Sequence, residues 1–290
     1  MLRILSLLAH LPASFLYLWV QPLYFVLFYV TRYRRKTVND NLARAFPYKS
    51  ESERTRLSKD FYIHIAEVGI EMLLLSNMST DDLRKRVTIV GREHLETLFD
   101  AKRSCLLLAA HQANWEWMLA AFNLYGPFPI DAFYRPLHSE DSDLFFKAMR
   151  SRFGVEMLSA EGAARTILRK RKQVRAIGLI ADQSPRRQDD KLWVNFLNTQ
   201  TPISPSPDRI ARLTQCPVLF VGTERLRRGY YHCTVTPLVS PPYTDNIQIS
   251  ALYMQAIEQQ IHRQPAYWMW SHQRWRYRQE ECPAPTTPNT

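Results

Sequence analysis

Residues 106–118, which read LLLAAHQANWEWM, lead from a run of apolar residues into an aromatic segment, and His111 stands at the junction. The apolar run predicts a buried strand, and the segment that starts at Trp115 predicts a helix. In α/β folds, ligands bind where a strand ends and the next helix begins. His111 and Glu116 would lie on different faces of one regular helix, but a histidine in the loop can meet a carboxylate in the first helical turn. Such a carboxylate would fix the tautomer of the imidazole.

The same alternation of strand and helix continues on either side of this segment. Short β-rich runs occur at 87–90, 105–110, 130–134, 176–181, 217–221 and 231–236. Stretches that predict helices lie between them, at 115–125, 141–153, 163–172, 207–214 and 247–263. Before them, apolar residues at spacings of three and four predict a helical neck over 37–79. The pattern predicts one α/β domain in which helices flank a mixed β-sheet.

An apolar segment near the start of the sequence is long enough to enter a membrane. Residues 4–30 carry no charged side chain, and roughly 20 apolar residues suffice to span a bilayer. The run is too long for a signal peptide and lacks an A-x-A cleavage site. Pro12 and Pro22 interrupt it, so the alternatives to a straight span are a kinked helix lying in one leaflet and a buried core helix.

A basic cluster, RYRRK at 32–36, follows this apolar segment directly. The positive-inside rule places such clusters at the cytoplasmic face, where anionic lipids also attract them. The sequence therefore predicts a membrane anchor with its basic flank at 1–36, a cytoplasmic α/β domain with its helical neck at 37–282, and a disordered tail at 283–290.

Composition and short motifs limit the classes of ligand and chemistry that the sequence favours, but they do not identify the function. The 38 basic and 27 acidic residues leave a net charge of +11, which suits nucleic acid, anionic lipid or phosphorylated small molecules. The four cysteines stand far apart and predict reduced thiols. The sequence contains no Walker loop, G-x-G-x-x-G, paired Cys/His ligand set or G-x-S-x-G elbow, which argues against nucleotide, metal and serine-hydrolase chemistry. A zinc site that uses His111 and Glu116 is the alternative left open.

Five blocks occur in a fixed order along the chain. They are H-x-x-x-x-E with the ending N-W-E at 111–116, Y-R-P at 134–136, R-F-G at 152–154, A-D-Q at 181–183, and Y-W-M-W-S-H-Q-R-W-R at 267–276. In sequence and spacing they resemble the lipid A biosynthesis (late) acyltransferases of the lysophospholipid acyltransferase superfamily, and the likeness covers nearly the whole chain. N-F-L-N at 195–198 and S-P-S-P at 204–207 depart from the family pattern, which bears on the acyl-chain and acceptor preferences.

The resemblance implies a catalytic pair and several substrate contacts. His111 would act as the general base, and Glu116 would orient it and stabilise the imidazolium. Arg135 offers paired donors for a phosphate or an oxyanion, with a surface ion pair as the alternative. Asp182 would position Arg135 or the acceptor, or make structural hydrogen bonds. The expected substrate-binding residues also include Asn114, Arg152 and Arg274, the last in an aromatic cluster whose alternative role is a membrane-interface belt.

The activity that the resemblance implies is O-acyl transfer in lipopolysaccharide biosynthesis. A fatty acyl chain would pass from a thioester of acyl carrier protein or coenzyme A to a hydroxyl of a lipid A precursor, a phosphorylated glycolipid. The reaction would take place at the cytoplasmic face of the bacterial inner membrane, with no cofactor, no metal and no nucleic acid. The alternatives are an acyltransferase for a lysophospholipid or an amino-acid-containing lipid, and a basic membrane-tethered binding protein without activity.

Overall fold

The strand β2 (Cys105–Ala109) is the middle strand of the main sheet. The structure is a computed structural model that describes residues 9–134, 139–160 and 162–277. All five side chains of β2 are buried. Alternate residues of a strand face opposite sides of the sheet, so Leu107 joins the core cluster on one face, whereas Leu106 and Leu108 join the cluster on the other. Burial on both faces explains why this segment is apolar at every position.

β2 belongs to a seven-stranded sheet within the described residues, in the order β1-β9-β8-β2-β5-β3-β4. The other strands are β1 (Val87–Val90), β3 (Ile130–Tyr134), β4 (Glu156–Ser159), β5 (Ala176–Ile180), β8 (Val218–Arg227) and β9 (Tyr230–Val239). β8 and β9 pair antiparallel, and the other neighbours in the sheet pair parallel. The predicted mixed sheet is therefore confirmed.

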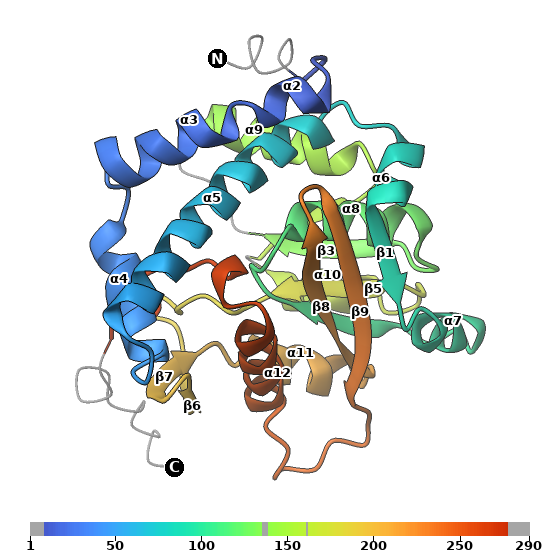
Figure 1. Ribbon diagram of the computed structural model, residues 1–290. Helices are drawn as coiled ribbons and strands as arrows, with labels where there is room; N and C mark the ends of the chain where they lie inside the picture. Colours follow the sequence, from blue (N-terminus) through green and yellow to red (C-terminus); the bar gives the residue numbers. More distant parts are fainter. Residues whose placement is uncertain (1–8, 135–138, 161, 278–290) are drawn as a thin grey trace.

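Helices cover both faces of the sheet (Figure 1). On one face, α8 (Trp115–Tyr125) contributes Trp117 and Phe122 to the core. The opposite face is covered by α11 (Ser206–Thr214) and α12 (Ile249–Arg263), which belong to the second core cluster. The remaining helices of the domain are α6 (Thr80–Arg86), α7 (Glu93–Asp100), α9 (Glu140–Ser151) and α10 (Ala163–Arg169).

A small hairpin stands apart from the main sheet and was not predicted. Its strands are β6 (Leu192–Phe196) and β7 (Thr199–Ile203), which pair antiparallel. Leu197 and Asn198 form the two-residue turn, and both have positive φ, at 48° and 62°. Two consecutive positive φ angles define the type I′ turn that suits the twist of a hairpin. The block that departs from the family pattern is therefore the tip of this hairpin.

The predicted helical neck is two helices, α4 (Arg35–Ala45) and α5 (Glu51–Leu75). Pro47 lies between them, where a proline disfavours a helical conformation of the residue before it. α5 begins with a capping box, in which Ser50 and Glu53 satisfy each other's backbone N–H groups.

The N-terminal apolar segment is helical and lies along α5 (Figure 1). It consists of α2 (Ala13–Tyr17), α3 (Val20–Phe25) and the π-helix η1 (Val26–Val30). By length and composition, Ala13–Val30 is sufficient to cross a membrane. The division of the chain at residue 36 stays a prediction, and the tail 283–290 lies outside the described residues.

Candidate active site

His111 follows the end of β2, beside Asp182 at the end of β5. The two strands are parallel, with Ala109 opposite Ile180, and the same register two residues further on brings His111 level with Asp182. Nδ1 of His111 lies 2.6 Å from Oδ1 of Asp182, and the backbone N–H of His111 donates to Oδ2 at 3.0 Å. A carboxylate can only accept, so Nδ1 carries the ring proton in this arrangement. The His111 side chain is 22% exposed, whereas that of Asp182 is 1% exposed.

The environment of Asp182 favours its charged form. Burial raises the pKa of the carboxyl, but the adjacent His111 and the indole N–H of Trp268 outweigh burial, so the pKa of Asp182 lies below its ordinary value. Trp268 donates to Oδ2 at 2.8 Å. Among the residues that the structure describes, Nε2 of His111 has no hydrogen-bond partner, and the ring lines a pocket. The unprotonated nitrogen of the imidazole is therefore Nε2, which is available as a base.

The loop after His111 is held in a strained shape by the C-terminal block. Ala113 has φ of 51°, a left-handed conformation that is unfavourable for residues with a Cβ. Its N–H donates to the carbonyl of Tyr267 at 2.9 Å, and the N–H of Met269 donates to the carbonyl of His111 at 3.0 Å. Nε2 of His64, on α5, lies 3.2 Å from the Ala113 carbonyl. Strained loops that are fixed from several sides are common at functional sites.

Glu116 has hydrogen bonds different from those predicted. Nε of Arg150 donates to Oε2 at 2.8 Å, Nη2 donates to Oε1 at 2.6 Å, and the indole N–H of Trp115 donates to Oε1 at 3.1 Å. In this structure the carboxylate bonded to Nδ1 of His111 is therefore that of Asp182, and not that of Glu116 as predicted. The reason is that α8 begins at Trp115, and the first turn of the helix directs Glu116 towards α9, which carries Arg150.

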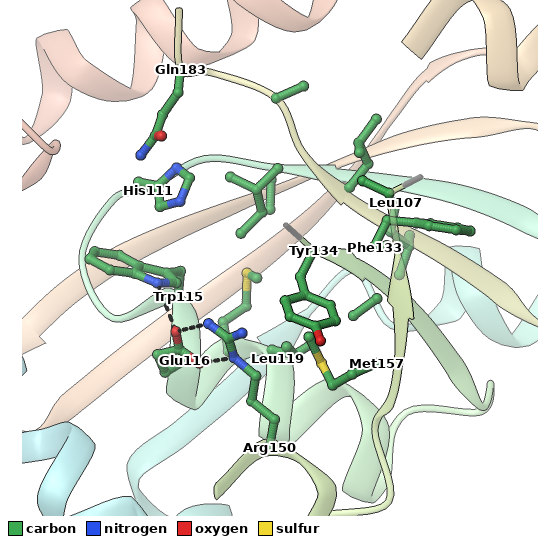
Figure 2. Close-up of a pocket in the computed structure, with 18 of the residues that line it drawn as sticks. Leu107, His111, Trp115, Glu116, Leu119, Phe133, Tyr134, Arg150, Met157 and Gln183 are labelled. Atoms are coloured by element: carbon green, nitrogen blue, oxygen red, sulfur yellow. Dashed lines mark hydrogen bonds and ion pairs between the residues drawn. The ribbon is translucent and has the colours of Figure 1, made fainter. Parts of the chain in front are cut away.

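A pocket of about 650 Å³ adjoins these residues. Its lining includes apolar side chains from five elements: Met72, Leu107, Leu119, Phe122, Ala132 and Ile180. Figure 2 shows His111, Glu116 and Arg150 on one side of this space and Leu107 and Met157 on the other. Apolar walls with a few convergent polar groups are typical of a site that binds an amphipathic ligand.

Comparisons with known proteins agree with this geometry. The model of the family described as bacterial lipid A biosynthesis acyltransferase matches residues 1–277. The chain belongs to this family. It is 23% identical to a lipid A biosynthesis lauroyltransferase of Escherichia coli, over 87% of this chain and 82% of the relative. It is also 23% identical to a lipid A biosynthesis palmitoleoyltransferase of Escherichia coli, over 91% of this chain and 89% of the relative.

A lipid A biosynthesis acyltransferase of Haemophilus influenzae is 21% identical, over 82% of this chain and 74% of the relative. The protein is therefore an O-acyltransferase of lipid A biosynthesis, and the family predicted from the five blocks is confirmed. The matched range includes the apolar segment near the start of the chain.

The other residues predicted to bind the substrates of the acyltransferase lie in varied surroundings. Arg135 lies outside the described residues. Asn114 is buried as the N-cap of α8, where its side chain accepts from the N–H of Trp117 and donates to Glu71 at 2.7 Å. Arg152 donates to the carbonyl of Leu75 at 2.9 Å. Asn114 and Arg152 therefore make structural hydrogen bonds.

Arg274 is also structural, because it is fully buried and donates to the carbonyl of Pro202 at 2.7 Å. Burial lowers the pKa of its guanidinium to about 10, although Asp182 opposes this shift. Arg274 was predicted to contact a lipid at the membrane surface, but in this structure its side chain is buried inside the domain. Aromatic residues interleaved with arginine suggested a surface belt, but Trp268 and Trp270 are buried as well.

Two polar residues that line the pocket beside His111 and Glu116 were not predicted from the sequence. Arg150 lies on α9, just outside the R-F-G block at 152–154, and its pairing with Glu116 depends on how α9 packs beside α8. Gln183 stands within the predicted A-D-Q block, and Figure 2 shows its amide beside the ring of His111. Within the described ranges, no group of three or more His, Cys, Asp or Glu side chains could hold a metal ion.

Proposed function

We propose that this acyltransferase moves a fatty acyl chain from a thioester of acyl carrier protein or coenzyme A to a hydroxyl of a lipid A precursor, with His111 as the general base. The reaction would take place at the cytoplasmic face of the inner membrane. The observation that supports the proposal best is the hydrogen bond between Nδ1 of His111 and buried Asp182, which leaves Nε2 unprotonated beside the pocket.

The proposed reaction needs no covalent intermediate on the protein. Nε2 of His111 takes the proton of the acceptor hydroxyl as its oxygen attacks the thioester carbonyl. The carbon–sulfur bond breaks when the tetrahedral intermediate collapses, and the imidazolium returns its proton to the thiolate that leaves. Asp182 would stabilise the imidazolium during the interval, because its charged carboxylate remains bonded to Nδ1.

Glu116 and Arg150 would position the substrates. Within the described part of the chain, the ion pair uses Nε and Nη2 of the guanidinium, and Nη1 would bind an oxygen of the acceptor, such as a phosphate oxygen. The side-chain amide of Gln183 would donate a hydrogen bond to the oxyanion of the tetrahedral intermediate, which is supported by its place beside His111 in Figure 2.

The apolar part of the pocket would hold the acyl chain. Met72, Leu119 and Phe122 offer a surface that excludes water from a hydrocarbon chain. An acidic carrier protein would be attracted by the net charge of +11 and by exposed basic side chains such as Arg169 and Arg171.

The proposal is tested by incubating the purified enzyme with labelled acyl thioesters and candidate acceptors. We expect a lipid A precursor to gain one ester-linked chain, identified by mass spectrometry, with acyl carrier protein or coenzyme A released. A His111→Ala variant should bind the acceptor but give no product above background. Acylation of a lysophospholipid alone would contradict the proposed acceptor.

A further inference from the structure

We propose that the segment Ala13–Val30 lies in the plane of the membrane surface, with one face on the acyltransferase domain and the other face in lipid, and does not cross the bilayer. Length and composition alone would permit crossing. The packing of the segment against the domain is what argues against it.

One face of the segment packs against the domain along almost its whole length. The buried and half-buried residues recur at spacings of one, three and four, as on one face of a helix: Ala13, Leu16, Tyr17, Val20, Leu23, Tyr24, Leu27 and Phe28. From the first to the last, this face extends about 22 Å at about 1.5 Å per residue. The domain therefore contacts the segment over most of the thickness of the hydrocarbon core that a spanning helix would have to cross.

The partner along this face is α5, which runs antiparallel to the segment. The rings of Phe28 and Tyr62 have centroids 5.3 Å apart at one end. At the other end, the hydroxyl of Tyr17 donates to the Glu71 carboxylate at 2.9 Å. A segment that crosses the bilayer in this arrangement would carry α5 into the hydrocarbon with it.

If the segment crossed the bilayer, charged groups of the domain would lie at the depth of the hydrocarbon core. Tyr17 is about 22 Å along the helix from Arg32, where the basic flank begins, whereas the hydrocarbon core is about 30 Å thick. The guanidinium of Arg228 lies 5.4 Å from the Tyr17 ring and pairs with Glu67, which also pairs with Arg225. The Arg228 side chain is 44% exposed, so lipid tails would surround a charge. The turn between β8 and β9 would also enter lipid, where exposed irregular backbone is not tolerated.

The opposite face of the segment suits lipid contact. Its exposed large side chains are Phe15, Leu18, Trp19, Phe25, Val26, Tyr29 and Val30. Tryptophan and tyrosine favour the level of the headgroups. Exposed basic residues flank both ends of the segment, with Arg32 and Arg34 at one end and Arg227 and Arg228 at the other. A spanning helix would carry one of these groups across the bilayer, whereas a helix in the plane brings both to the headgroups of one anionic leaflet.

Cysteine labelling tests the topology in the full-length enzyme. The background is Cys282→Ser, because Cys105, Cys216 and Cys233 are buried. One cysteine is placed in a short hydrophilic tag before Met1, and a second protein carries Ser52→Cys at the exposed start of α5. A membrane-impermeant maleimide is then applied to intact spheroplasts and to inside-out membrane vesicles.

We expect both cysteines to react in inside-out vesicles and neither to react in spheroplasts. A tag cysteine that reacts only in spheroplasts, while Ser52→Cys reacts only in vesicles, would overturn the proposal. A nitroxide at Leu18 gives an independent measure of depth. The proposal places it within about 10 Å of the headgroup boundary, whereas a label within about 5 Å of the bilayer midplane, as in a spanning helix, would overturn it.

Discussion

At the scale of single residues, the candidate site contains two carboxylates with different hydrogen-bond partners. Asp182 accepts three hydrogen bonds, two of them from His111, and fixes the tautomer of the imidazole. Both carboxylate oxygens of Glu116 accept hydrogen bonds from Arg150 or Trp115, so neither oxygen is placed to take a proton from a substrate. The two acidic residues therefore have separate effects that mutation can distinguish.

Replacing Asp182 with Asn should impair turnover much more than binding. An amide would present N–H groups towards the donors that now surround the carboxylate, and Nδ1 of His111 would lose its acceptor. We expect kcat to fall by about 10²-fold to 10⁴-fold with little change in KM. Steady-state kinetics checks this, and an Asp182→Asn enzyme with wild-type kcat would rule out the orienting role.

Glu116 and Arg150 should behave as a coupled pair. Removing one partner from a buried ion pair leaves an uncompensated charge, which costs about 3–5 kcal/mol of stability. Glu116→Leu and Arg150→Met should each lower the free energy of unfolding, and the double variant should lose less than the sum of the two. Chemical denaturation in mild detergent measures all four proteins. Strict additivity would show that the pair is not coupled.

His272 should make the fold sensitive to mild acid. Ser184 donates its N–H to Nε2 of His272 at 2.9 Å, so this nitrogen must be unprotonated. Burial, assisted by Arg274, lowers the pKa of His272 to about 4. The unfolded chain binds a proton below a pH of about 6.5 and the folded chain does not, so the stability that this neutral histidine contributes is present above that pH and is lost as the pH falls towards 4.

Between pH 7 and pH 4.5, we expect the wild type to lose about 2 kcal/mol more stability than His272→Gln. The glutamine can still accept from Ser184 but does not titrate. Denaturation curves at the two pH values provide the measurement. Equal pH dependence of the two proteins would contradict the assignment of a neutral His272.

The sequence predicted the residues of the site better than their contacts. His111 could be placed at a strand end because the apolar run before it is continuous. Its bond to Asp182, 71 residues away, depends on β5 lying next to β2, and strand order is not encoded in local patterns. Arg150 was missed for the same reason, since α9 reads as an ordinary amphipathic helix.

At the scale of elements, the N-terminal helices are the most informative. Leu18 and Phe25 are exposed and apolar, so they contribute little to the fold, and the proposal above assigns them to membrane contact. The double variant Leu18→Glu with Phe25→Glu should have an affinity for anionic phosphatidylglycerol vesicles that is at least tenfold lower, because a charge placed at this depth in the membrane is costly. Co-sedimentation with the vesicles measures this affinity. The unfolding temperature should change little.

Leu213→Glu is the matched control, because it changes another exposed leucine, on α11, which Figure 1 shows at the opposite end of the molecule from α2 and α3. This control should bind vesicles like the wild type. Equal loss of binding in the control and the double variant would refute the assigned membrane-facing surface.

Elements with strong periodicity were predicted well, and those set by tertiary context were not. β2 and α8 agree with the sequence because burial on both faces and the aromatic helix leave clear patterns. The β6–β7 hairpin was missed because its short strands, which lie outside the main sheet, have a weak pattern. The neck was predicted to be helical without a break, and the interruption at Pro47 shows that the proline outweighs apolar spacing.

At the scale of the whole molecule, the pocket forms where the central sheet meets α5, α8 and α9. Ala132 on β3 is one of its smaller lining residues, and it is 7% exposed. Ala132→Leu should fill part of the space and shift the preference towards shorter acyl chains, with kcat/KM for the longest accepted donor falling at least tenfold. Competition between thioesters of different length measures this shift, and an unchanged profile would show that the acyl chain lies elsewhere.

The most direct test of the proposed chemistry is the turnover of His111→Asn with an acyl thioester and a lipid A precursor. Asparagine can still donate to Asp182 and so preserve the local structure, but it lacks the basic nitrogen at the position of Nε2. We predict a loss of about 10²-fold to 10⁴-fold in kcat at unchanged thermal stability. Turnover at the wild-type rate by a folded His111→Asn enzyme would contradict the account.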